Sequence, residues 1–145
     1  MRVEVREDPF DPWDALRRYQ DELTDQVGRY GATAVFVGTM RDFNEGDAVQ
    51  AMTLEHYPGM TEQFLEELSA RAAAQWDILD SLVIHRVGPL WPNDPIVLVA
   101  VWSAHRGAAF DASRFLMEEL KSRAPFWKKE TLASGKRWVQ KNTPG

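Results

Sequence analysis

Cysteine is absent from the 145 residues of this chain. Its absence excludes disulfide bonds, thiolate metal sites and a cysteine nucleophile. If the protein handles sulfur, it cannot carry that sulfur as a persulfide of its own. The sulfur must then arrive on a partner or on a small molecule.

Long apolar segments are also absent. No apolar run approaches the roughly 20 residues that cross a bilayer, and no basic start leads into an apolar segment of signal-peptide length. We therefore expect no contact with a membrane, and we take the cytoplasm as the default location.

The motifs of common cofactor sites are missing as well. The three histidines, His56, His85 and His105, show no spacing that metal ligands use. The chain has neither a Walker loop nor a GxGxxG fingerprint. We therefore expect no metal and no cofactor.

The charges that are present are distributed unevenly. The net charge is −5, yet residues 121–145 hold seven basic residues and a single acid, Glu130, while the other 120 residues hold ten basic and 21 acidic residues. An acidic body with a basic end favours a local anion site over a general affinity for polyanions. The length favours one domain spanning residues 1–145.

Hydrophobic periodicity predicts an α+β fold with a mainly antiparallel sheet and about three helices. Asp11 is the expected N-cap of the first helix, with Pro12 at its first position. In chain order we expect a strand at 2–7, a helix to about 29, a strand at 31–41 with its antiparallel return at 48–57, a helix at 60–76, strands at 78–88 and 96–104, a helix at 107–123, and two short strands near 126–132 and 136–140.

Two details of these elements can be tested directly. The strand at 96–104 is almost continuously apolar, which predicts burial on both faces. The second helix is expected to bury one row of residues spaced by four, namely Met60, Phe64, Leu68, Ala72 and Trp76. The third helix offers its own set for burial, namely Phe110, Phe115, Leu116 and Leu120.

The first candidate site is the junction between the buried strand and the third helix. His105 and Arg106 stand there, where unpaired helical N–H groups favour anions and an arginine adds bidentate recognition of oxygen. A capping histidine beside a surface arginine explains the same residues equally well.

Two further arginine positions follow the same logic. Arg41 leaves a predicted strand and opens a glycine-containing loop, where a phosphate or carboxylate clamp competes with the more common exposed turn arginine. His85 and Arg86 repeat the His–Arg pair inside a predicted strand, so their side chains point to opposite faces. One of them can face a site while the other supports the sheet.

The third candidate is the lysine-rich segment around Pro125. Lys121 lies in the last turn of a predicted helix, where a cation also complements the helix dipole. Lys128 and Lys129 point to opposite faces of an extended segment, so one of them is expected to be solvated or paired with Glu130. A lysine beside aromatic rings and other cations loses proton affinity and becomes a usable acid, base or nucleophile. Taken alone, a basic surface over Trp127 is the commoner explanation.

The ordered set of blocks resembles the large, catalytic subunit of molybdopterin synthase. The resemblance covers about residues 31–139, and its blocks are "GATAVFVGTMRDFNEGDAVQAMTLEHYPGM", "HRVGPLW", "SAHRGAAFDA", "LKSRAPFWKKE" and "GKRWV". It implies an α/β hammerhead-type fold. It also implies conversion of cyclic pyranopterin monophosphate to molybdopterin by insertion of two sulfurs. The sulfur donor would be the C-terminal glycine thiocarboxylate of a small ubiquitin-like subunit, and two large subunits would form the central dimer of a heterotetramer.

The same resemblance implies roles for individual residues. Lys121 and Lys128 match the family's two key lysines, and Arg41, His105 and Arg106 match its anion-binding groups, with Lys128 also near the substrate. The supporting residues that it implies are Phe36, Met117, Pro125, Lys129 and Glu130. The turn "PNDP" replaces a more usual Gly-acid turn, and the tail after Val139 is short.

Two other classes remain compatible with the residues. A module that binds single-stranded nucleic acid could use the basic end and the six tryptophans, although the overall acidic charge disfavours it. A structural dimer subunit could use the same basic end to contact a neighbour.

Overall fold

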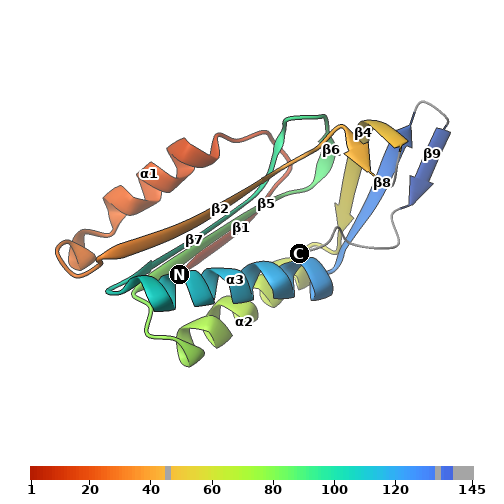
Figure 1. The fold of residues 1–145 in the computed structure, drawn as a ribbon. Coiled ribbons are helices and arrows are strands. Elements are labelled where there is room, and N and C mark those ends of the chain that lie inside the picture. Colours follow the sequence, from red (N-terminus) through yellow and green to blue (C-terminus); the bar gives the residue numbers. More distant parts are fainter. Residues whose placement is uncertain (45–46, 133–134, 139–145) are drawn as a thin grey trace.

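The computed structural model describes residues 1–44, 47–132 and 135–138, and it arranges them as two β-sheets and three α-helices (Figure 1). The strands are β1 (Arg2–Arg6), β2 (Ala32–Thr39), β3 (Phe43–Asn44), β4 (Asp47–His56), β5 (Asp80–Arg86), β6 (Gly88–Leu90), β7 (Pro95–Ser103), β8 (Phe126–Leu132) and β9 (Gly135–Trp138). The helices are α1 (Pro12–Glu22), α2 (Met60–Gln75) and α3 (Arg106–Arg123), with a 3-10 turn at Thr24–Gln26.

The first sheet forms the body of the molecule. Its strands lie in the order β1-β5-β7-β2, and only β1 and β5 run parallel within it. Helix α1 covers one face, and helices α2 and α3 cover the other (Figure 1). The expected α+β fold with a mainly antiparallel arrangement is therefore confirmed.

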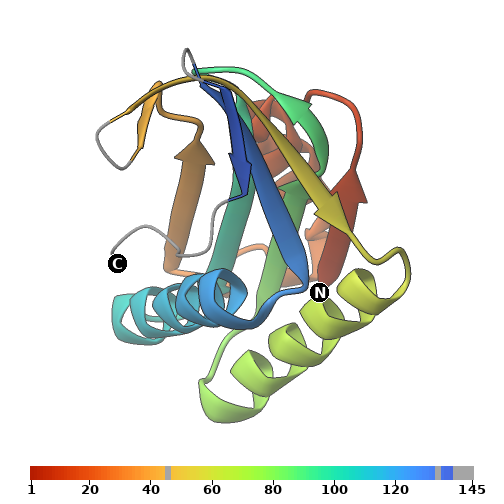
Figure 2. The ribbon, with the colours of Figure 1, turned by 90° about the vertical axis from the view of Figure 1, so that its right-hand side faces the viewer.

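The second sheet extends from one end of the first. It follows the order β3-β4-β8-β9, and β6 pairs with β4 outside this path. Figure 2 shows β8 leaving the C-terminal end of α3 and running beside β4, which leads into α2. The last turn of α3 and the second sheet therefore meet at the same end of the molecule.

Strand β7 is the centre of the core. Every residue from Val97 to Ser103 is buried, which confirms the prediction of a strand covered on both faces. Its residues alternate between a cluster under α2 and α3 and a cluster under α1. The first set is Val97, Val99 and Val101, and the second is Leu98, Ala100 and Trp102.

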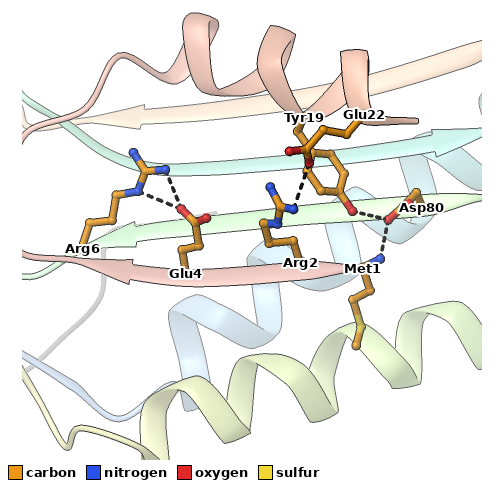
Figure 3. A network of polar contacts seen from close by, with 7 residues as sticks. All are labelled: Met1, Arg2, Glu4, Arg6, Tyr19, Glu22 and Asp80. Carbon is orange, nitrogen blue, oxygen red and sulfur yellow. Dashed lines mark hydrogen bonds and ion pairs between the residues drawn. The ribbon is translucent and has the colours of Figure 1, made fainter. Parts of the chain in front are cut away.

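A network of polar contacts joins α1 to the edge of the first sheet (Figure 3). The amino group of Met1 lies 2.6 Å from Asp80, and the hydroxyl of Tyr19 donates to the same carboxylate at 2.8 Å. Arg2 pairs with Glu22 at 2.9 Å and lies over the Tyr19 ring. Burial, and then the hydrogen bond to Asp80, raise the pKa of Tyr19, so its hydroxyl remains a donor to Asp80. The network fixes α1 against β1 and β5.

The predicted start of α1 is correct, but its predicted end is not. The Asp11 carboxylate accepts hydrogen bonds from the backbone of Trp13 and Asp14, and Pro12 begins the helix as expected. The helix ends at Glu22 and not near Arg29, because the chain passes through Leu23 into a 3-10 turn. Val27, which continues the helical spacing, is 74% exposed, so burial of its side chain does not favour another helical turn.

The predicted hairpin between segments 31–41 and 48–57 is wrong. Strand β2 pairs with β7, and β4 pairs with β3, β6 and β8. Adjacency in sequence favours a hairpin, but β2 instead forms the edge of the first sheet beside the apolar strand β7. The loop predicted at 42–47 contains the short strand β3, and residues 45 and 46 lie outside the described part of the chain.

The predicted buried rows of α2 and α3 need correction. In α2, Met60 is 58% exposed, whereas the buried stripe follows the 3.6-residue period. A row spaced by four drifts around the helix by about 40° at each step, so Met60 at one end of the row lies off the core face. The rest of the row is placed as predicted, because Leu68 and Ala72 are buried and Phe64 and Trp76 pack against the same cluster. The buried residues of α2 are Thr61, Leu65, Leu68, Ser69 and Ala72. In α3, Leu116 and Leu120 are buried as expected, but Phe110 is 64% exposed.

Candidate functional site

Lys121 and Lys128 converge where α3 passes into β8. Helix α3 ends at Arg123 because Pro125 follows its C-cap, Ala124, and the Pro125 carbonyl accepts a hydrogen bond from the Thr61 hydroxyl of α2 at 3.4 Å. The chain then turns directly into β8. Lys121 and Lys128 are both half-buried, and the charge of Lys128 acts on Lys121. The two lysines therefore lie at the same end of the molecule, where α3 meets the second sheet.

The pairing of β8 with β4 determines which way Lys128 points. Residues directly opposite each other in an antiparallel pair lie on the same face of the sheet. Lys128 is opposite Leu54, and Leu54 is almost completely buried. Lys128 therefore lies on the inner face of the second sheet, above the cluster that contains Leu54, Leu90 and Met40.

The environment of the two lysines favours their neutral forms. Burial, and then the charge of Lys128, lower the pKa of Lys121 to about 8. Burial also lowers the pKa of Lys128, while the carboxylate of Glu130 acts in the opposite direction. At neutral pH a lysine with a pKa near 8 holds its proton but releases it readily, so it can serve as an acid and then as a base.

Glu130 is a buried acidic residue on the inner face of the second sheet, the same face as Lys128. It is 4% exposed, and its carboxylate accepts a hydrogen bond from the Nε of Arg137 on β9 at 3.1 Å. Glu130 lies two residues after Lys128, so both side chains are on the inner face. Its carboxylate is thus placed to balance the charge of Lys128.

Lys129 takes the other face, as strand alternation predicts. Its ammonium lies 5.5 Å from the centre of the Trp138 ring, so it is neither fully solvated nor paired with Glu130. Trp127, on the same outer face, packs edge-on against Tyr57 with ring centres 4.4 Å apart. Lys129 therefore belongs to an aromatic outer surface and does not reach the two lysines.

His85 is the neighbour that the sequence analysis left undecided. It is 4% exposed, and its ring stacks on Phe126 with centres 4.0 Å apart. The charges of Lys121 and Lys128 both act on it. Arg86, on the opposite face, donates to the carbonyl groups of Glu7 and Pro89 and ties the sheet to its loops. The His–Arg pair in a strand was the available signal, but only the tertiary structure identifies His85 as the member beside the lysines.

Arg41 lies at the same end of the molecule as Lys128. It follows Met40, which packs in the buried cluster with Leu54. The Met40 backbone exchanges hydrogen bonds with the turn at Asn93 and Asp94. Arg41 itself is exposed, so its side chain can reach a ligand at this end.

His105 and Arg106 lie at the far end of α3 from Lys121. Both are exposed, and they flank the first turn of the helix. Lys121 lies 16 positions after His105, which corresponds to about 24 Å of helix. Figure 1 shows that the N-terminal end of α3 points away from the second sheet. Within one chain, the predicted His–Arg pair is therefore not part of the lysine site.

The remaining supporting residues that the resemblance implies differ in whether they lie near the two lysines. Met117 is 7% exposed and lies one helical turn before Lys121, so it shares that face of α3. Phe36 is 41% exposed on β2, opposite Val99, and therefore on the face of the first sheet that α3 covers. Pro125 forms the turn between the two lysines.

The described residues contain no group of three or more His, Cys, Asp or Glu side chains that could hold a metal ion. Within the same ranges, no helix has both the length and the apolar character needed to cross a membrane. The tail at 139–145, with its one basic residue Lys141, lies outside the described residues.

Comparison with known proteins identifies similar chains. The model of the MoaE protein family matches residues 5–123. The molybdopterin synthase catalytic subunit of Ralstonia nicotianae is 61% identical over 109 residues, which are 75% of this chain and 62% of that protein. The catalytic subunit of Pasteurella multocida is 50% identical over 140 residues, which are 97% of this chain and 90% of that protein.

Solved structures show the same architecture. Molybdopterin synthase from Staphylococcus aureus superposes with a TM-score of 0.82 at 29% identity, covering 94% of this chain and 95% of that one. A Helicobacter pylori complex of subunits 1 and 2 of molybdopterin-converting factor superposes with a TM-score of 0.77 at 20% identity, covering 95% of this chain and 90% of that one. The second likeness concerns the fold alone.

Proposed function

Because the chain belongs to the MoaE protein family, we propose that it is the catalytic subunit of a molybdopterin synthase and acts as a sulfurtransferase. In this role it takes sulfur from the C-terminal thiocarboxylate of a small ubiquitin-like subunit and adds it to cyclic pyranopterin monophosphate. The observation that carries the proposal is the convergence of Lys121 and Lys128, from a helix end and a strand, at a half-buried place where their proton affinity is lowered.

The lysines match the needs of this chemistry. The thiocarboxylate sulfur attacks a carbon of the pterin side chain and displaces an oxygen substituent of that carbon, which takes up a proton from a lysine as the carbon–oxygen bond breaks. The sulfur is then bonded to both the substrate and the acyl group of the partner. Water then cleaves this thioester, so that the sulfur stays on the substrate and the partner ends in a carboxylate. Two adjacent cations attract the anionic tail and stabilise the oxyanion that forms as each thioester breaks. A lysine that releases its proton near neutral pH can also transfer protons to and from the reacting groups.

The small subunit would reach the lysines by its tail. An extended Gly-Gly terminus is thin enough to enter beside the lysines, and its negative end is attracted by them. The absence of cysteine in this chain agrees with delivery of the sulfur by a partner.

A second copy of this chain would complete the phosphate site. His105 and Arg106 lie about 24 Å along α3 from Lys121, which is too far for both ends to contact one small substrate. In the proposed central dimer, the His–Arg pair of one protomer can face the lysines and Arg41 of the other. Anion binding by the helix N-terminus and arginine would then hold the substrate phosphate.

Substitution of the two lysines tests the assignment. We expect Lys121→Ala and Lys128→Ala each to lower turnover with thiocarboxylated small subunit by roughly 100-fold or more, since a positioned acid–base group contributes about that much. Lys129→Ala is the matched control, because Lys129 lies one residue away on the outer face. Wild-type turnover in folded Lys121→Ala and Lys128→Ala enzymes would reject the assignment.

A further inference from the structure

Phe126 is the first residue of β8 and belongs to the connection between the two lysines. Only residues 122–127 separate Lys121 on α3 from Lys128 on β8. Helix α3 packs on the first sheet, whereas β8 is part of the second sheet (Figure 2). The placement of one lysine relative to the other therefore depends on how the start of β8 is held against the first sheet.

The side chain of Phe126 lies on the inner face of the second sheet. Lys128 is opposite the buried Leu54 and is therefore on that face, and residues two apart in a strand share a face. A strand rises by about 3.3 Å per residue, so the backbone positions of Phe126 and Lys128 are roughly 6 to 7 Å apart. Over so short a length of strand, a displacement of Phe126 also displaces Lys128.

A buried histidine of the first sheet stacks on this phenylalanine. The ring centres of His85 and Phe126 are 4.0 Å apart, and the ring planes differ by 17°. His85 belongs to β5, which lies between β1 and β7 in the first sheet. The stacked pair is therefore a side-chain contact between the start of β8 and an interior strand of the other sheet.

The His85 ring is itself held in place. It is 4% exposed, and its Nδ1 atom lies 2.7 Å from the carbonyl oxygen of Arg86. A carbonyl oxygen only accepts hydrogen bonds, so Nδ1 donates its proton there. Burial is the main cause that lowers the pKa of His85 to about 3, so the ring stays neutral near neutral pH. Phe126 thus packs on a flat ring of fixed orientation and constant charge.

Two hydrogen bonds hold the same connection just before the stacked pair. The Thr61 hydroxyl of α2 donates to the Pro125 carbonyl at 3.4 Å. The backbone N–H of Phe126 donates to the Ala124 carbonyl at 2.8 Å. These bonds fix the backbone where α3 ends, and the stack on His85 fixes the first side chain of the strand that follows.

We propose that the stacked rings of His85 and Phe126 position Lys128, because they hold the start of β8 against the first sheet and so set the place of Lys128 relative to Lys121. His85 and Phe126 are positioning residues in this scheme, and the inference rests on the proposed function of the lysines. A misplacement of about 1 Å can lower a rate by about 100-fold, so even a small shift of the strand has a measurable effect.

Substitution of Phe126 tests the proposal. The full chain is mixed with thiocarboxylated small subunit, and single-turnover rates are measured at saturating cyclic pyranopterin monophosphate. We expect Phe126→Leu to lower this rate roughly 10-fold, while the half-saturating substrate concentration and the Kd for the small subunit change by less than about 2-fold. A wild-type rate in folded Phe126→Leu would overturn the proposal, because the pair would then serve stability alone.

Substitution of His85 shows whether the stacked ring is the feature that matters. His85→Leu removes the ring and should lower the rate as Phe126→Leu does. His85→Phe keeps an aromatic ring against Phe126 and should retain most of the wild-type rate. The double variant His85→Leu, Phe126→Leu should be no slower than either single variant, since all three lose the same contact. Equal losses in His85→Leu and His85→Phe would overturn the proposal.

The sharpest comparison places Phe126→Leu in a chain that already carries Lys128→Ala. If the stacked pair acts through Lys128, the second substitution has nothing left to misplace, and the residual rate of Lys128→Ala should not change. A general disturbance of the site would instead lower both rates by the same factor. Equal fold losses in the two backgrounds would therefore overturn the proposal.

Phe115→Leu is the matched control for the loss of an aromatic ring. Phe115 is a half-buried residue of α3 whose ring centre lies 5.1 Å from that of Trp76, so it is not part of the connection to β8. We expect Phe115→Leu to lower the melting temperature and to leave the single-turnover rate unchanged. If Phe126→Leu does not fold, Phe126→Met replaces it, because an unbranched side chain fills the space more easily, and the same outcomes decide.

The failure of this inference can be separated from a failure of the proposed function. Wild-type turnover in Lys128→Ala alone would defeat the proposed function, and no variant of the stacked pair is needed to find this. Impaired Lys128→Ala together with a wild-type rate in Phe126→Leu would defeat the positioning role and leave the lysine assignment standing.

Discussion

Lys121 carries a positive charge at a place that disfavours it. Burial and the neighbouring charge of Lys128 lower its pKa from the usual 10.5 to about 8. Between these two values the unfolded chain binds more protons than the folded chain, so stability rises with pH across that window. Below pH 8 the folded protein bears the full cost of the buried ammonium.

Replacing this lysine should therefore stabilise the fold while removing its chemistry. We expect Lys121→Met to raise the free energy of unfolding at pH 7 by about 1 to 3 kcal/mol, and this gain should fade as the pH approaches about 10.5. Urea unfolding at pH 7 and at pH 10 measures the difference. Lys129→Met, on the outer face over Trp138, is the control and should show no such dependence on pH. A less stable Lys121→Met protein at pH 7 would contradict the prediction.

At the scale of the elements, the approach of β2 to the end of β7 depends on a glycine. The backbone N–H of Gly31 donates to the Ser103 carbonyl at 2.9 Å. A Cβ at position 31 would lie 2.5 Å from the carbonyl oxygen of Ala104, which is backbone and cannot swing away. This contact aligns the edge strand just where the chain turns from β7 into α3.

Replacement of two different glycines by alanine should therefore change the free energy of unfolding in opposite directions. We expect Gly31→Ala to lower the free energy of unfolding by about 1 to 3 kcal/mol, because the backbone must shift to admit the methyl group. Gly107, in the first turn of α3, has no atom within 4 Å of an added Cβ. Gly107→Ala should therefore raise stability by about 0.5 to 1 kcal/mol through its better helix propensity. Thermal denaturation of both variants checks the pair, and equal effects would show that the close approach is unimportant.

At the scale of the whole molecule, the distance along α3 decides how a site can be completed. Lys121 and Arg106 belong to the same helix, yet about 24 Å of helix separates the His–Arg end from the lysine end. A single chain therefore presents half of the predicted site at each end. A two-fold arrangement of two chains would allow each half to meet the complementary half of the partner.

Mixing two inactive variants tests this arrangement. If Lys121→Ala and Arg106→Ala chains are unfolded together and refolded as mixed dimers, half of the dimers hold both variants, and each of these has one intact site. We therefore expect recovery of roughly a quarter of wild-type turnover. Each variant refolded alone is the control. No recovery above the separate variants would mean that the two residues act within one chain or that Arg106 is not needed.

Features that depend on neighbours along the chain could be predicted from the sequence. Asp11 and Pro12 start α1 because a side-chain oxygen next to a fixed φ angle satisfies the first helical N–H groups. Pro125 ends α3, and the apolar run of β7 is buried on both faces, as predicted. The ordered blocks also identified the family correctly, because a set of motifs in one order is far more specific than any of them alone.

Which of these features come together in space could not be predicted, because it depends on the tertiary fold. Strand β4 pairs with β8 and not with β2, and this pairing places Lys128 on the inner face beside Lys121. The same arrangement brings His85 to the lysines and leaves His105 at the far end of α3. Local spacing carries no information about such pairings, because they depend on which apolar surfaces cover one another when the whole chain folds.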